Sequence, residues 1–590
     1  SPHDSNTVYA CGNHVFSSRD EGMSWEALSP DLTRADDSKL DVSGGLTVDS
    51  SGAETYGTIS TFAESSHQPG KFWAGTDDGL VHLSTDGGKH WENVTPKDLP
   101  EWAYIYCIET STHDPDVLYL SATRYKLDDY RPYLYKSVDG GKNWKNICGN
   151  YPENEISRVI REDPKNPGLL FVGSETGIFF SHNDGANWNR LGGNFPVVPV
   201  YDLKIKDDEM VVATHGRSFW ILDDLNPIRE SSRFKAEDDF HFFPPKSTFR
   251  RTLNWSTNLF MGDGKNYSPA FGIPGTSYVS EDKNGEKQTR YLDLGENPPQ
   301  GVIFHYVLND PENSKLELQI LDSKGNLIDT FETKQEDKVS GQTENDDEED
   351  QKPALTSSKG LNRFVWNMRY PGPAEKIDKT LEQKRYKALG RGEMGERGGP
   401  TAMPGTYQAV LRIENTKQEH HFEILKDPRL ETSEEDYQAQ FDLWMNIRDQ
   451  LSETNRLLNQ LRRIRREIHV ILERPNLQKS KVPDELSSFK DNAEKVIQKL
   501  EVLENELVQT KNETPSDRLR FPVMLRDRIE GLISVVAVAE AAPPQQAHEV
   551  FQHLKGLLAE KTSSMQQLLS VDLLTLKELA QKANIQFFEE

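Results

Sequence analysis

Three features are scarce in this 590-residue sequence, and each scarcity excludes a class of protein. The only cysteines are Cys11, Cys107 and Cys148, too few for a disulfide framework. No apolar run approaches the roughly 20 residues that cross a bilayer, so no membrane span is expected. Lysine and arginine number 69 against 95 aspartate and glutamate, and the resulting net charge of -26 argues against nucleic acid as a partner.

Metal and cofactor sites are not expected either. The sequence contains no His-x-x-x-His pattern and no cluster of cysteine with histidine. The acidic run 345–350 lacks the glycine and the spacing of a calcium loop. The glycine-rich stretch 390–400 does not connect a strand to a helix, as a phosphate-binding loop does. We therefore predict neither a metal nor a cofactor.

A pattern of the form Ser-x-Asp-x-Gly-x-x-Trp recurs along the first part of the chain. Its serine and aspartate can bond the backbone of a tight turn, its glycine can adopt a positive φ, and its tryptophan can pack on the hairpin. Each copy should therefore build a rigid hairpin between a third and a fourth strand. The copies are Ser18, Asp20, Gly22 and Trp25; Ser84, Asp86, Gly88 and Trp91; Ser137, Asp139, Gly141 and Trp144; and Ser181, Asn183, Gly185 and Trp188.

This repeat resembles the Asp-box, or BNR, repeat of sialidase-like, xyloglucanase-like and sortilin-like β-propellers. The phrases SPDLTR at 29–34, LPEW at 99–102, REDP at 161–164 and ATHGRSFWILDDL at 213–225 are similar to those of a large group of secreted bacterial proteins with sortilin-type propellers. Members of that group are often described as glycosyl hydrolases. The resemblance implies a secreted, periplasmic or cell-surface protein.

Alternating apolar residues predict Asp-box β-propeller blades in residues 1–228. Three full blades are preceded by the last three strands of one blade and followed by the first three strands of another. Incomplete blades leave sheet edges with unpaired backbone groups. We therefore expect a missing N-terminal segment, or another chain, to complete the propeller, which places further sequence upstream of Ser1.

After residue 228 the chain is predicted to form mostly strands and then helices, so the whole protein is expected to be mainly β with an α-helical C-terminus. Residues 229–300 read as a connector, and 301–427 as an immunoglobulin-like β-sandwich with an acidic insertion and a Gly-rich insertion. Residues 428–590 have helical periodicity and predict an intrachain helical bundle. Its long first helix should be capped by Thr432 or Ser433 and end before Pro475.

The candidate site lies in the turns between the second and third strands, which should border the central channel. A loop between Arg124 and Arg131 should extend beyond its blade, because it is longer than a tight turn needs. Arginine can clamp a carboxylate and tyrosine can stack on a sugar or peptide, so we predict a peptide or glycan ligand. The ligand-binding candidates are Arg124, Tyr125, Asp128, Asp129, Arg131, His215 and Arg217.

Three functions stay open at this point. The favoured one is an extracellular or periplasmic protein that binds a ligand on its propeller, with the other domains as a scaffold. The second is a glycoside hydrolase, which needs two suitably spaced carboxylates; the candidates are Asp78, Asp129 and Glu175. The third is a structural subunit of a cell-surface assembly, docked through its helices.

Overall fold

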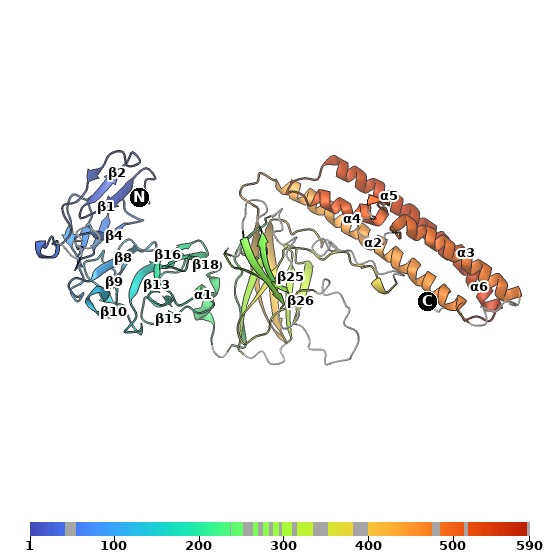
Figure 1. Cartoon of the computed structure of the whole chain (residues 1–590), viewed down its shortest axis with the longest axis horizontal. Helices are drawn as coiled ribbons and strands as arrows, with labels where there is room; N and C mark the ends of the chain where they lie inside the picture. Colours follow the sequence, from blue (N-terminus) through green and yellow to red (C-terminus); the bar gives the residue numbers. More distant parts are fainter. Residues whose placement is uncertain are drawn as a thin grey trace. The chain divides into compact units, whose positions relative to one another are not determined.

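The computed structural model describes residues 1–41, 46, 55–235, 238–251, 264–268, 275–281, 287–293, 295, 298–309, 315–333, 352–381, 399–474, 484–511, 517 and 519–586 (Figure 1). The chain divides into two compact units, Ser1–Glu237 and Asp238–Glu590. The first unit and the beginning of the second are mainly β, and the second unit ends in helices.

The first unit is built of antiparallel sheets that follow one another along the chain. The first sheet, β1–β2–β3, and the last, β16–β17–β18, have three strands each, and the sheets between them have four. The strands are β1 (Val8–Cys11), β2 (Val15–Ser18), β3 (Glu26–Ala27), β4 (Ile59–Glu64), β5 (Phe72–Thr76), β6 (Val81–Ser84), β7 (Glu92–Asn93), β8 (Tyr104–Thr110), β9 (Leu118–Arg124), β10 (Asp129–Ser137), β11 (Lys145–Asn146), β12 (Ser157–Glu162), β13 (Leu170–Ser174), β14 (Ile178–Ser181), β15 (Asn189–Arg190), β16 (Val200–Lys206), β17 (Glu209–Thr214) and β18 (Phe219–Leu222).

Consecutive sheets pack face to face, with the first strand of each sheet beside the first strand of the next: β4 contacts β8, β8 contacts β12, and β12 contacts β16. Small residues permit this close approach. A Cβ atom on Gly75 would lie 2.5 Å from the side chain of Ile105, and one on Gly173 would lie 2.6 Å from that of Val200. Larger residues at these two positions would force the sheets apart.

The four Ser-x-Asp/Asn-x-Gly-x-x-Trp hairpins, here called boxes, share one set of hydrogen bonds. Each serine Oγ accepts from the backbone N–H of the box glycine at 2.8–3.0 Å. Each aspartate or asparagine Oδ1 accepts from the backbone N–H four residues later at 2.9–3.0 Å. The glycines have φ between 79° and 100°, a region that favours glycine. The polar side chains of the boxes are therefore used to hold the turn.

The second unit opens with two sheets that share one apolar core. The rings of Phe304 and Phe422 meet edge to face at 5.5 Å, and those of Phe331 and Phe364 lie 4.7 Å apart. One sheet is β19 (Phe240–Phe242), β24 (Val302–Leu308) and β27 (Gly360–Trp366); the other is β20 (Thr248–Phe249), β29 (Thr416–Leu425), β28 (Gly405–Ile413), β25 (Leu316–Leu321) and β26 (Leu327–Glu332). The immunoglobulin-like classification stays a prediction.

Residues 229–300, which the sequence predicts as a connector, contain a further antiparallel sheet of β21 (Gly264–Ser268), β22 (Gly275–Glu281) and β23 (Lys287–Tyr291). Helix α1 (Asn226–Glu230) lies at the boundary of this segment. The sheet's strands GKNYS and KQTRY are polar, so they lack the alternating apolar residues by which strands were recognised. Most of each predicted insertion, 334–351 and 382–398, lies outside the described residues.

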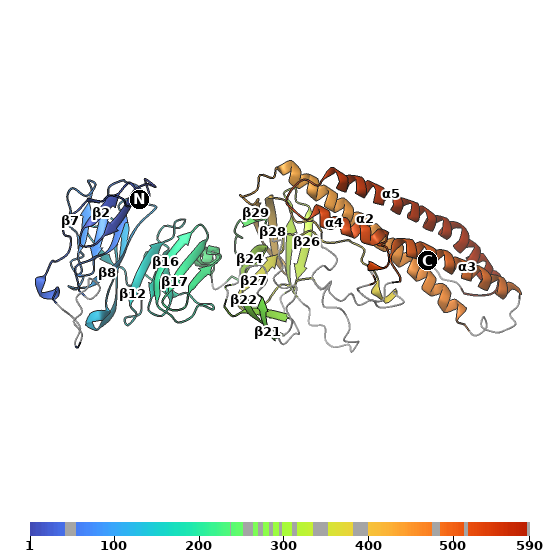
Figure 2. The same ribbon diagram turned by 45° about the horizontal axis from the view of Figure 1, so that its top comes forward.

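The chain ends in helices whose long members run side by side (Figure 2): α2 (Glu434–Leu472), α3 (Asp484–Leu507), α4 (Leu525–Val536), α5 (Gln545–Gln567) and α6 (Leu574–Lys582). Ser433 caps α2, confirming one of the two predicted caps, and Asp436 completes a capping box. Helix α4 begins only after Pro522, which disfavours helical backbone at the residue before it. Among the described helices, none is long and apolar enough to cross a membrane.

Candidate functional site

Arg158 is a buried cation at the start of strand β12. Its side chain is 5% exposed, and its Nε and Nη2 atoms donate to Glu175 Oε2 at 3.2 and 2.6 Å. Glu175 lies in the turn between β13 and β14 and is 41% exposed. One face of the pair is thus closed and the other reaches solvent.

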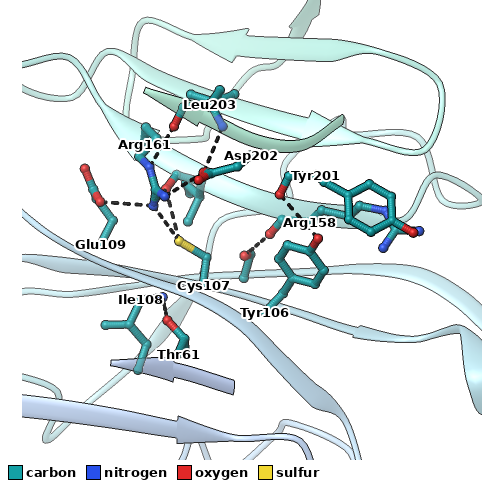
Figure 3. A network of polar contacts seen from close by, with 12 residues as sticks. Thr61, Tyr106, Cys107, Ile108, Glu109, Arg158, Arg161, Tyr201, Asp202 and Leu203 are labelled. Carbon is teal, nitrogen blue, oxygen red and sulfur yellow. Dashed lines mark hydrogen bonds and ion pairs between the residues drawn. The ribbon is translucent and has the colours of Figure 1, made fainter. Parts of the chain in front are cut away.

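Three tyrosine rings surround the Arg158 guanidinium. Its central carbon lies 4.5 Å from the ring centre of Tyr201, 5.5 Å from that of Tyr125 and 5.6 Å from that of Tyr106. Tyr106 belongs to β8, Tyr125 to the turn after β9, and Tyr201 to β16, so three consecutive sheets meet at one cation. Tyr106 also donates its hydroxyl to the Tyr201 carbonyl at 3.3 Å (Figure 3), and burial raises the pKa of Tyr106 to about 12.

His215 extends this cluster to the surface. Its ring stacks on Tyr201 with centres 4.8 Å apart and an interplanar angle of 26°. The turn between β17 and β18 positions it, with the His215 backbone N–H bonded to the Pro199 carbonyl at 2.9 Å. The same turn exposes Arg217, which pairs with no carboxylate among the described residues and donates to the Gly216 carbonyl at 3.0 Å. The Arg158 cluster, consisting of Tyr106, Tyr125, Arg158, Glu175, Tyr201 and His215, therefore ends in an exposed imidazole beside an available cation.

A second arginine on the same strand ties the sheets together. Arg161 donates to Cys107 Sγ at 2.7 Å and Glu109 Oε2 at 3.2 Å on β8, and to Asp202 Oδ1 at 2.8 Å on β16 (Figure 3). Burial raises the pKa of Glu109, while the nearby Arg161 opposes that rise. All these groups are occupied with one another, which assigns them to the connection between sheets.

The predicted extended loop at Arg124 does not exist. Arg124 pairs in register with Asp129, and a short 3₁₀ turn followed by Asp128 at φ 57° closes the hairpin. The predicted loop between Arg124 and Arg131 was too long because the residues after Asp129 belong to strand β10, where a bulge displaces the register before Tyr133.

Asp129 binds two of the three arginines that were predicted to bind a ligand. Arg131 donates to its two oxygens at 2.9 and 2.8 Å, Tyr133 donates its hydroxyl at 2.6 Å, and Arg124 lies at 3.5 Å. These bonds, above all those from Arg131, hold the pKa of Asp129 below its usual range. Both arginines are therefore already paired, whereas Asp128 is exposed.

Replacing Asp129 with asparagine tests this pairing. A carboxylate with a depressed folded-state pKa stabilises the fold above its unfolded pKa of about 3.9, and this stabilisation is lost as pH falls. We expect Asp129→Asn to cost about 1–2 kcal/mol at pH 7 and to flatten the pH dependence of unfolding below pH 4. Denaturant unfolding between pH 7 and pH 3 measures the loss of stability and its pH dependence. If the free energy of unfolding of Asp129→Asn changed with pH in parallel with that of the unmodified protein, the pairing of Asp129 with Arg131 would be contradicted.

The candidate catalytic carboxylates are held by fixed donors. Asp78 is 1% exposed and accepts from the Thr76 hydroxyl at 2.5 Å and the Arg34 backbone N–H at 2.7 Å. Asp129 is held as described above, and Glu175 is bound by Arg158. All three carboxylates are therefore already engaged by hydrogen-bond donors of the protein itself. Within the described residues, no group of histidine, cysteine, aspartate and glutamate could hold a metal.

The sequence interpretation placed Tyr125, Glu175 and His215 near one another but missed the cluster's centre. Arg158, Tyr106 and Tyr201 lie near the beginnings of first strands, whereas the predicted site consists of turns between second and third strands. A signal was available, since a bulky polar residue is the first or second residue of three of these first strands, at Tyr104, Arg158 and Tyr201.

Comparison with known proteins gives distant matches. No family model matches the chain. The chain is 24% identical over 146 residues to the xyloglucanase Xgh74A of Acetivibrio thermocellus, covering 21% of this chain and only 17% of the relative's length. A solved structure of a GH74 enzyme of Niastella koreensis is 16% identical, with a TM-score of 0.25, and the match covers 38% of this chain and 29% of that one. A solved structure of a GH74 xyloglucanase of Xanthomonas campestris is 12% identical, with a TM-score of 0.30, and the match covers 73% of this chain and 79% of that one. These matches are with glycoside hydrolases and leave the family of this chain open.

Proposed function

We propose that the first unit is part of an Asp-box β-propeller and binds a glycan on the exposed end of the Arg158 cluster. The observation that carries this proposal is the stack of His215 on Tyr201 and of Tyr201 on Arg158, built from consecutive sheets. A stack held from several sides is pre-organised, so little ordering free energy is lost on binding. The exposed imidazole offers a ring face to a sugar, and Arg217 offers hydrogen-bond donors.

The sequence similarity to a xyloglucanase favours a glycan over a peptide. The rest of the proposal follows the same resemblance: a secreted, periplasmic or cell-surface protein whose second unit is a scaffold or docking module. A peptide ligand would use the same exposed groups and is an outcome of the binding experiment. The site itself favours binding over hydrolysis, because the candidate acids Asp129, Glu175 and Asp78 are already bonded to Arg131, Arg158 and the Arg34 backbone N–H.

Substitution of the two exposed groups tests the binding site. We expect His215→Ala and Arg217→Ala each to weaken binding about ten-fold, since each removes one stacking or charge-assisted contact. Both side chains are exposed, so thermal stability should change little. Binding is measured on arrays of neutral and acidic oligosaccharides, with xyloglucan fragments included, and of peptides.

Arg233→Ala is the matched control, because Arg233 is 73% exposed and pairs with Glu230, its neighbour three residues earlier. Its binding should equal that of the unmodified protein. Glycan binding that survives both substitutions unchanged would contradict the site, and peptide binding lost in the same variants would reassign the ligand class.

Glycoside hydrolysis is the second candidate, supported by the similarity to the xyloglucanase. It would require one of Asp78, Asp129 and Glu175 to exchange a proton with the substrate. Release of reducing ends from xyloglucan measures this activity directly. Turnover that disappears in Asp129→Asn or Glu175→Gln, with the fold intact, would replace the binding proposal by the hydrolase.

A further inference from the structure

Box tryptophans connect three sheets of the first unit to the sheet before each of them. Trp91, Trp144 and Trp188 donate their indole N–H groups to the backbone carbonyls of Leu28, Val94 and Ile147 at 3.1, 2.7 and 2.9 Å. In every case the acceptor is the residue that directly follows the outer strand of the preceding sheet, β3, β7 or β11. The connection therefore repeats with the sheets and uses one backbone atom per interface.

The box glycines lie against the same acceptors in two of these interfaces. A Cβ atom on Gly88 would lie 2.6 Å from the Leu28 carbonyl oxygen, and one on Gly185 would lie 2.6 Å from that of Ile147. Because no side chain fits there, the box presses directly on the preceding sheet. The hydrogen bond and the close approach together define a specific docking surface.

The first box has this surface uncovered. Trp25 is 46% exposed, and its indole N–H has no acceptor among the described residues. The position of a Cβ on Gly22 approaches only Trp25 itself, at 3.5 Å. Strand β1 pairs only with β2, which leaves its other edge open in the described part, and Val8 on it is 43% exposed. The first sheet thus has the donor of a sheet interface without the partner.

We infer that the face formed by Gly22, Trp25 and β1 docks a further antiparallel sheet, carried by polypeptide outside residues 1–590. That sheet presents to Trp25 the carbonyl that follows its outer strand, and the same polypeptide continues into an inner strand that pairs beside β1. The internal repeats of this chain indicate what the partner provides, since three sheets of the same unit already supply a backbone carbonyl to the box tryptophan of the next sheet.

The sheet left free at the other end of the first unit does not fit the face. In the described residues this sheet, β16–β17–β18, has no fourth, outer strand, and so it has no residue that directly follows one. The required acceptor is therefore missing from it. The inference rests on the proposed propeller, but not on its ligand: loss of glycan binding in His215→Ala leaves it untouched.

The test supplies the partner from the chain itself. A duplicate of residues 57–116, which contains sheet β4–β7 and strand β8, is fused ahead of Ser1 in the full chain. Hydroxyl-radical footprinting read by mass spectrometry then reports the oxidation of each tryptophan. We expect oxidation of Trp25 to fall several-fold in the fusion, with Trp91 as an internal reference, and the fusion carrying Trp25→Phe to melt at a lower temperature. Unchanged oxidation of Trp25 in a folded fusion would overturn the inference.

The unmodified chain supplies a second measurement that does not depend on the duplicate. Trp144→Phe removes a made hydrogen bond and should lower the melting temperature by about 2–5 °C, whereas Trp25→Phe should change it by less than about 1 °C. Equal losses would show that Trp25 already has its acceptor and would overturn the inference. Light scattering that detects a dimer sensitive to Trp25→Ala would assign the face to a second copy and overturn it as well.

Discussion

Arg158→Ala is expected to lower the free energy of unfolding of the first unit by about 2–4 kcal/mol and to abolish glycan binding. Each cation–π contact contributes about 0.5–2 kcal/mol, and Arg158 makes three of them besides its bonds to Glu175. Its removal also leaves a space among Tyr106, Tyr125 and Tyr201 into which the rings can turn. Because His215 stacks on one of these rings, the binding surface would lose its support.

Two variants separate the loss of charge from the loss of shape. Arg158→Lys keeps the charge but lacks the planar guanidinium that lies over the rings, so we expect about half the loss of stability and weak binding. Glu175→Gln leaves the cation among its tyrosines and should cost only about 1 kcal/mol, since Glu175 is 41% exposed. Denaturant unfolding and the oligosaccharide array provide the two readings. If Arg158→Ala kept both the free energy of unfolding and the glycan binding of the unmodified protein, the Arg158 cluster would have no functional role.

The elements of this chain follow from local patterns, and the site's contacts do not. Ser433 and Pro475 marked the ends of α2, and the box residues marked each hairpin, because caps and tight turns depend on neighbours in sequence. The pairing of Arg158 with Glu175 joins residues on separate elements, and Tyr106 and Tyr201 arrive from other sheets. No spacing along the sequence encodes such a meeting.

The same limit explains the wrong prediction at Arg124. Sequence spacing gave the number of residues between two arginines, but the bulge in β10 decided how many of them remain in the sheet. Because β10 begins at Asp129, opposite Arg124, the hairpin places both Arg124 and Arg131 beside the Asp129 carboxylate. The two arginines judged free in the sequence were in fact paired with a carboxylate, while Arg217, in a true turn, donates to a backbone carbonyl and pairs with no carboxylate among the described residues.

The largest loss of stability is expected from Glu504→Gln in the helical region. Glu504 on α3 is 5% exposed and bridges two arginines of α2: Arg462 Nε donates to its Oε1 at 2.7 Å, and Arg465 donates to its Oε2. Both arginine side chains are 8% exposed. Glutamine would remove the buried carboxylate that both arginines bind, and losing one member of a buried ion pair costs about 3–5 kcal/mol. Urea unfolding followed at the transition of the helical region measures this loss.

Glu506→Gln is the matched control on the same helix, because Glu506 is 46% exposed and pairs with Lys561 at 2.9 Å. An exposed pair contributes about 0–1 kcal/mol, so this variant should unfold almost as the unmodified chain does. Replacing all three buried residues, Glu504→Leu with Arg462→Met and Arg465→Leu, should recover most of the stability, since apolar residues of similar volume need no counter-ion. A loss in Glu504→Gln no larger than in Glu506→Gln would show that water reaches the buried arginines and that the bridge does not hold α2 to α3.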